Sequence, residues 1–167
     1  MNRLFLTILT LTAIASCNTP NKKITDMEES KSKPGPTASN DTTPKVTGVG
    51  GVFFFSENPK ETREWYAKNL GFDVNDWGST FQFRNADRPE EINQLQWTPF
   101  KKGSDYFAPS KKEFMINYRV QNIEGLVKKL RENGVTIVDD IVSYDYGKFV
   151  HIMDAEGNKI ELWEPVD

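Results

Sequence analysis

The chain has 167 residues, with 21 Lys and Arg against 24 Asp and Glu, one histidine and a formal net charge of −3. Because it is mildly acidic and has no basic stripe that could neutralise phosphates, we expect no nucleic acid as a partner. Its single cysteine excludes both a disulfide framework and a cysteine-based metal site.

The first residues have the pattern of an export signal. Arg3 is followed by an apolar run at 4–16, which is shorter than the ~20 residues that span a bilayer as a helix. Residues 14–17 resemble the lipobox of bacterial lipoproteins, whose cysteine receives a diacylglycerol and becomes the new N-terminus. We therefore predict a signal peptide at 1–16, lipidation of Cys17 and an exported protein anchored to a membrane of the cell envelope. A free thiol behind an ordinary signal peptide is the alternative.

Residues 17–45 form a segment of different composition, rich in Lys, Ser, Thr, Asn, Glu and Pro, with almost no large apolar side chain. Such a segment buries too little surface to offset the entropy of ordering it, which predicts a flexible tether. The remaining residues, 46–167, are long enough for one domain with a single core.

Two segments of this domain share one pattern. In the first, an apolar run at 52–55 leads to Asn58 and a helical pattern that stops at Gly71. In the second, a run at 115–120 leads to Asn122 and a helical pattern that stops at Gly134. Asparagine can accept hydrogen bonds at a helix start, and glycine can adopt the left-handed conformation that ends a helix. The repeat predicts a duplicated strand-helix module.

The expected elements follow in chain order. Helices are predicted at 59–70 and 123–133, a polar loop at 100–112, and strands at 48–55, 80–84, 93–98, 114–120, 136–138, 141–144, 149–153 and 159–163. This is an α+β fold of two βαβββ modules, about 46–100 and 113–167, in a cupped mixed or antiparallel sheet with helices on the outer face.

Four segments, 58–66, 69–72, 114–120 and above all 154–165, are similar to the vicinal oxygen chelate superfamily of glyoxalases, bleomycin-resistance proteins and extradiol dioxygenases. The resemblance covers nearly all of 46–165. It implies that the paired modules curl into a cup that holds a small ligand. In metal-dependent members, His, Gln or Glu on the inner strand faces bind a divalent ion.

The ligand positions implied by this resemblance are poorly matched. The first-strand ligand falls at Gly51, which has no side chain, and the matching position of the second module falls at Met115, whose thioether suits a hard cation poorly. The last strand of the first module offers Leu95 or Gln96, and Glu161 matches the final carboxylate. A catalytic site of this kind needs about three protein ligands. We therefore predict no metal and no other cofactor, with a divalent ion as the alternative.

Strand alternation predicts what the cup contains instead. The inward side chains are expected to be Phe53, Phe55, Met115, Asn117, Arg119, Glu161 and Trp163, while Val52, Phe54, Ile116, Tyr118, Ile160 and Leu162 pack beneath the helices. Such an aromatic-walled pocket, with Asn117, Arg119 and Glu161 as its polar groups, is typical of small-molecule sites. An Arg119 to Glu161 ion pair that only satisfies buried charges is the alternative to a ligand-binding role.

Other candidates lie near the mouth of the expected cup. His151 shares a strand face with Phe149 and could be a general base or a metal ligand, although a structural role is favoured. Tyr146 could donate a hydrogen bond to a ligand. An apolar lid or ordinary core is expected from Trp97, Phe100, Tyr106 and Phe107.

Two functional classes follow. The first is a module that binds a small, partly apolar compound, an anionic one included, as metal-free drug-binding members of the family do. The second is a lyase or isomerase of the glyoxalase type with a non-standard or metal-free site, with Arg119 and Glu161 as acid and base. Loss of the ligands at Gly51 and Met115 favours binding. The identity of the compound and the oligomeric state, a homodimer included, stay open.

Overall fold

The computed structural model describes residues 41–166, so the predicted signal peptide, Cys17 and most of the tether lie outside the described residues. The elements are β1 (Lys45–Ser56), α1 (Pro59–Leu70), β2 (Ser79–Arg84), β3 (Ile92–Lys101), the 3-10 helix η1 (Asp105–Phe107), β4 (Phe114–Gln121), α2 (Ile123–Glu132), β5 (Val142–Tyr144), β6 (Gly147–Met153) and β7 (Lys159–Pro165). Neither helix of this part is long and apolar enough to cross a membrane.

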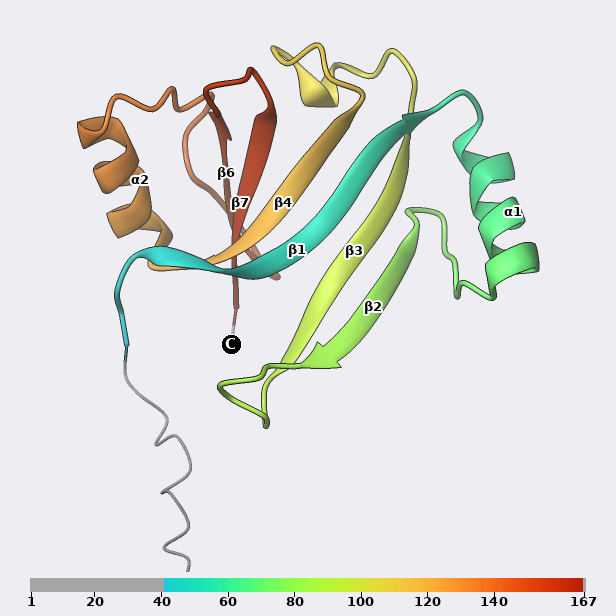
Figure 1. Ribbon diagram of the computed structural model, residues 1–167, viewed down its shortest axis with the longest axis horizontal. Helices are drawn as coiled ribbons and strands as arrows, with labels where there is room; N and C mark the ends of the chain where they lie inside the picture. Colours follow the sequence, from blue (N-terminus) through green and yellow to red (C-terminus); the bar gives the residue numbers. More distant parts are fainter. Residues whose placement is uncertain (1–40, 167) are drawn as a thin grey trace, which may run out of the picture. The chain divides into compact units, whose positions relative to one another are not determined.

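The strands form one mixed sheet in the order β2-β3-β1-β4-β7-β6-β5 (Figure 1). The two halves of the chain meet where β1 pairs antiparallel with β4. Each of these two strands also has a parallel neighbour, β3 beside β1 and β7 beside β4. The predicted α+β class and mixed sheet are confirmed.

Both helices begin at the asparagine that the sequence pattern indicates. The side chain of Asn58 accepts from the backbone N–H of Glu61, and that of Asn122 accepts from Gly125. Each bond satisfies a backbone donor that has no partner within the helix. Helix α1 ends at Gly71, whose φ of 71° is the left-handed conformation in which glycine is not strained.

The predicted module order βαβββ is found in the second half, as β4-α2-β5-β6-β7, and is altered in the first. The first half has the order βαββ, one strand fewer than predicted, and only an isolated bridge from Val74 to Ser79 lies between α1 and β2. In the second half the predicted strand at 136–138 is an isolated bridge from Ile137 to Ile152. Its pairing stops because the backbone N–H of His151 donates to the side chain of Asp139 in place of a backbone carbonyl.

The end of the predicted tether contacts the domain. The side chain of Gln121 donates to the carbonyl oxygens of Asp41 and Thr43, and that of Asn122 donates to Thr42. Strand β1 already begins at Lys45. The described residues of the tether are therefore held against the end of β4.

The helices pack on the outer face of the sheet and bury two groups of side chains. Helix α2 covers a buried aliphatic core of Val120, Ile123, Leu126, Val127, Val150, Ile152 and Leu162, with Tyr118 and Ile160 packed against it. On the side of α1, Trp97 packs against Phe54, Tyr66 and Phe72. Trp97 is therefore part of the outer packing and not of a lid. Removing this apolar surface from water stabilises the fold.

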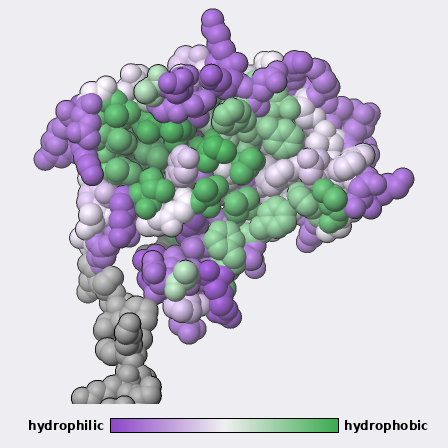
Figure 2. All heavy atoms as spheres, in the orientation of Figure 1, coloured by the Kyte–Doolittle hydropathy of each residue, from purple (hydrophilic) through white to green (hydrophobic). Residues whose placement is uncertain are grey.

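Figure 2 shows that apolar side chains also gather on the face between the two helices, over the central strands. A second buried cluster, which we call the inner core, consists of Phe53, Phe107 and Met115, and Phe55 and Phe100 pack against it.

A homodimer, with or without exchanged modules, stays a prediction.

Candidate ligand-binding site

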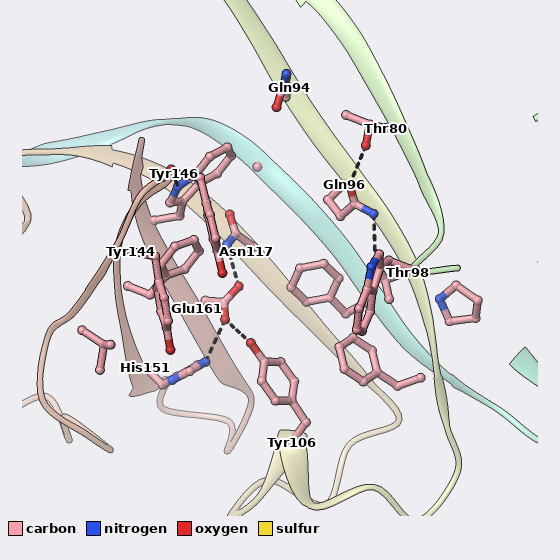
Figure 3. A pocket seen from close by; sticks show the side chains of 18 of the residues that line it. Thr80, Gln94, Gln96, Thr98, Tyr106, Asn117, Tyr144, Tyr146, His151 and Glu161 are labelled. Carbon is pink, nitrogen blue, oxygen red and sulfur yellow. Dashed lines mark hydrogen bonds and ion pairs between the residues drawn. The ribbon is translucent and has the colours of Figure 1, made fainter. Parts of the chain in front are cut away.

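A cavity of about 1040 Å³ lies on the inner face of the sheet. Figure 3 shows side chains from both halves of the chain that point into it. Its lining includes Gly50, Phe53, Gln96, Thr98, Phe100, Tyr106, Asn117, Asp139, Tyr144, Tyr146, Phe149, His151, Glu161 and Trp163. The cavity therefore collects residues from all seven strands, including Thr80 of β2, and from η1.

Five positions lie in one line across neighbouring strands, and we call them the central row. The strand registers pair Gln96 with Gly51, Gly51 with Asn117, Asn117 with Glu161, and Glu161 with His151. Four of the five carry a polar side chain that lines the cavity. The row has a break at Gly51, where no side chain exists.

The central row corrects the predicted ligand positions. An irregularity between Val49 and Gly51 shifts the pairing of β1 with β4, so Asn117, and not Met115, lies opposite Gly51. Met115 pairs with Phe53 and is fully buried in the inner core. Between the two candidates in β3, Gln96 lines the cavity.

An aromatic ring fills the space at the break in the row. A Cβ atom at position 51 would come within 2.8 Å of the Phe53 ring and 3.2 Å of the Asn117 Cβ. Only glycine leaves room for this ring. The position at which the family resemblance implies a first-strand ligand is thus covered by an apolar side chain.

Glu161 is the centre of a buried hydrogen-bond cluster. Its carboxylate accepts from the Asn117 amide at 2.7 Å and from the Tyr106 hydroxyl at 2.5 Å, and it lies 2.9 Å from His151 Nε2. The other ring nitrogen of His151, Nδ1, is 2.6 Å from Asp139. The result is a chain of groups from Asp139 through His151 and Glu161 to Tyr106. Figure 3 shows its part from His151 to Tyr106.

These contacts shift the pKa values of the cluster. Burial raises the pKa of Glu161, but the hydrogen bonds with His151, Tyr106 and Asn117 lower it by more than burial raises it. The pKa of Glu161 therefore lies below its ordinary value. Burial lowers the pKa of His151, but its bonds to Glu161 and Asp139 outweigh this and raise it above 6.5. Burial and the charge of Glu161 raise the pKa of Tyr106. The cluster thus favours an imidazolium between two carboxylates, with a neutral phenol.

Two contacts hold Tyr106 over the cluster. Its ring stacks on Phe100, with the centroids 4.8 Å apart and the planes at 8°. The ammonium of buried Lys159 donates to the backbone carbonyl of Tyr106 at 2.7 Å. Among the residues predicted as lid or core, Phe100 and Tyr106 line the cavity, whereas Phe107 is fully buried.

The ion-pair partner of Arg119 is Glu91 and not the predicted Glu161. Its guanidinium lies 3.7 Å from a carboxylate oxygen of Glu91 and 5.0 Å from the centre of the Trp163 ring. Arg119 pairs with Trp163 in the sheet, two residues beyond the pair of Asn117 and Glu161. Glu161 therefore has Asn117 beside it, and the ion pair of Arg119 is formed with the β2–β3 loop.

One wall of the cavity is aromatic. The rings of Tyr144 and Tyr146 stack at 5.4 Å and 4°, and the edge of Phe149 meets both. Phe149 in turn stacks on Trp163 at 6.0 Å. The predicted cavity residues Phe53, Tyr146 and Trp163 line this space. Phe55 instead stacks on Phe107 at 4.3 Å in the inner core.

Sequence reasoning did not name Asp139, and it expected only a lid or core role for Tyr106. Asp139 lies on a loop and meets His151, and Tyr106 lies on a short 3-10 helix and meets Glu161. Both contacts exist only in the folded chain. For His151 there was a usable signal, because it alternates with Phe149 on one strand face. Only the β6–β7 register places that face on the cavity beside Glu161.

The described residues do not fit the metal site that the family resemblance implies. Within 41–166 no group of three or more His, Cys, Asp or Glu side chains is arranged to hold a metal ion. In the central row, Gly51 offers no ligand and Gln96 uses its amide on Thr80 and Thr98. Asn117 and Glu161 are bonded to each other.

The chain belongs to the Glyoxalase/Bleomycin resistance protein/Dioxygenase superfamily, whose family model matches residues 48–162. This confirms the resemblance seen in the sequence. A comparison with curated proteins gave no match.

Solved structures with a similar fold include methylmalonyl-CoA epimerases. A variant of the Streptomyces coelicolor enzyme in complex with 2-nitronate-propionyl-CoA is 16% identical, with a TM-score of 0.55 and coverage of 74% of this chain and 100% of that one. A methylmalonyl-CoA epimerase in complex with methylmalonyl-CoA and NH4+ has the same identity and TM-score, with coverage of 73% and 96%. The Mycobacterium tuberculosis enzyme is 23% identical, with coverage of 75% and 92% and a TM-score of 0.47. At such identities the likeness to the two structures with a TM-score of 0.55 shows the fold alone.

Proposed function

We propose that this protein is an exported, membrane-anchored lipoprotein of the cell envelope whose domain binds a small, partly apolar compound in the cup. The observation that carries the proposal is the cavity of about 1040 Å³, with an aromatic wall on one side and the central row on its floor. Small-molecule sites combine mostly apolar linings with a few convergent polar groups. The anchor is inferred from residues 1–17, which lie outside the described residues.

The cavity supports binding without the metal chemistry of the family. The Phe53 ring covers Gly51, and the Glu161 carboxylate already accepts from Tyr106 and Asn117. A metal ion at the central row would have to break these bonds. A bound compound can instead contact the aromatic wall with the cluster intact.

A binding screen tests the proposal. The full chain is screened in detergent against a small-molecule library, with and without divalent metals, by the shift in its melting temperature. Hits are then titrated against Trp163→Leu. Loss of the ring contact should weaken binding roughly fivefold. Trp65→Leu is the matched control, because Trp65 lies on α1 and is 55% exposed. If both variants bind the hits equally, the compounds do not occupy this cavity.

A second candidate function is a lyase or isomerase of the glyoxalase type, and the chain from Asp139 to Tyr106 favours it. A histidine between two carboxylates can take up and release a proton near neutral pH. Arg119 lies against Glu91 and Trp163, so His151 replaces it as the acid-base partner of Glu161. Incubation of the hits with the chain in D2O separates the two candidates. Deuterium uptake at a carbon of the compound, lost in His151→Gln, supports the enzyme, and unchanged compound supports the binding protein.

A further inference from the structure

We propose that the compound bound in the cup is a protonated amine attached to a planar apolar group. This inference rests on the proposed binding function and deepens it by naming the chemical class of the ligand. Three features support it: the charges around the cavity, a buried hydrogen-bond acceptor on its floor to which no described residue donates, and the aromatic wall.

The ionisable groups that line the cavity are mostly acidic. Four carboxylates line it, from Asp76, Asp139, Asp140 and Glu161, against two cationic side chains, Lys101 and the protonated His151. Walls of one charge sign concentrate the field in a cavity and attract ions of the opposite sign. The cavity is therefore suited to a cation.

The cations near the cavity are each bonded to a protein oxygen. The ammonium of Lys101 donates to the backbone carbonyl of Glu57, and that of Lys159 donates to Tyr106. His151 lies between Asp139 and Glu161. An anionic ligand would have to compete with these oxygens for its counter-charge, whereas an ammonium ion can meet the carboxylates of Asp76 and Asp140, which lie outside the hydrogen-bond cluster of Glu161.

The floor of the cavity has a hydrogen-bonding group without a partner in the described part of the chain, and this group is an acceptor, which also suits a cationic ligand. The amide N–H of Asn117 is used on Glu161, while its carbonyl oxygen Oδ1 is buried, points away from Glu161 (Figure 3) and has no partner among the described residues. The side chain of Asn117 lines the cavity and is 2% exposed. A buried acceptor without a donor is costly. An ammonium N–H supplies the kind of group that this oxygen lacks.

The aromatic wall is suited to both parts of such a ligand. Tyr144 and Tyr146 are 52% and 62% exposed, so their ring surfaces are accessible to a planar apolar group. Trp163 already holds one cation, the guanidinium of Arg119, 5.0 Å from its ring centre. The negative face of an aromatic ring attracts an organic cation in the same way.

Three probes with one ring system test the inference. Naphthalen-1-ylmethylamine is a cation at pH 7, 1-naphthalenemethanol is neutral and 1-naphthoate is an anion. Each is titrated calorimetrically into the full chain in detergent, and a titration into detergent alone is subtracted. We expect the amine to bind at least tenfold more tightly than either of the others, with an advantage that shrinks as salt rises because screening weakens exposed charges.

The variant Asp140→Asn removes one carboxylate from the cavity. It should weaken binding of the amine about threefold and leave binding of the alcohol unchanged, while Glu132→Gln, at an exposed acid on α2, should change neither. Equal or tighter binding of 1-naphthoate, or no binding of the amine, overturns the inference. The proposed function fails separately, if the hits of the library screen are insensitive to Trp163→Leu.

Discussion

The Nε2 atom of His151 lies 2.9 Å from the carboxylate of Glu161, while the Nδ1 atom of the same ring lies 2.6 Å from Asp139. The only histidine of the sequence is thus bracketed by two carboxylates at the edge of the cavity. This arrangement makes both the stability of the domain and the charge of its cup dependent on pH.

The stability should fall as the pH rises above 6.5. The pKa of His151 is raised above 6.5, so between 6.5 and the raised value the folded chain holds a proton that the unfolded chain has lost. The contribution is complete below 6.5 and disappears as the pH passes the folded pKa. Urea unfolding between pH 5 and pH 9 measures it. In His151→Gln this decline should disappear, and a decline of the same size in the variant would assign it to other groups.

Gly50→Ala should destabilise the domain by about 1 to 3 kcal/mol, as expected for overpacking. A Cβ atom there would collide with Asn117 Oδ1 and approach Trp163 to 2.9 Å and Arg119 to 3.0 Å. The matched control is Gly48→Ala in the same strand, where an added Cβ meets nothing within 4 Å. Chemical denaturation compares the two. Equal losses would mean that the floor of the cup can rearrange.

The purified chain should contain no stoichiometric Zn, Ni, Fe or Mn. The reason is the composition of the central row, in which Gly51 offers no side chain and Asn117 donates to Glu161. Elemental analysis of protein produced in metal-supplemented medium measures the content. About one equivalent per chain that is lost in Glu161→Ala would contradict the expectation, and His151 would then be the first additional ligand to test.

Replacing Cys17 with Ser should release the protein from the membrane. Residues 14–17 resemble a lipobox, and a serine hydroxyl is not the thiol that receives the diacylglycerol. Fractionation and detergent partitioning of parent and variant, followed by mass spectrometry of the N-terminus, measure the effect. Equal partitioning into the detergent phase would show that the anchor lies elsewhere. The melting temperature of the described domain should be the same in both.

The sequence by itself determined the parts of the fold that depend on neighbouring residues. Asn58 and Gly71 bound α1, and Asn122 begins α2, because a cap acts on backbone groups within one turn of it. Alternation along β7 placed Glu161 and Trp163 together on the cavity side, because successive side chains of a strand point to opposite faces.

Only the tertiary structure decided which distant residues meet in the cup. The irregularity between Val49 and Gly51 moves the pairing with β4 and brings Asn117 opposite Gly51. The loop between β2 and β3 supplies Glu91 for Arg119, and the register of β6 with β7 puts His151 beside Glu161. Such contacts depend on strand register and loop path, which no local pattern encodes, since shifting a strand by one residue reverses the face of every side chain on it.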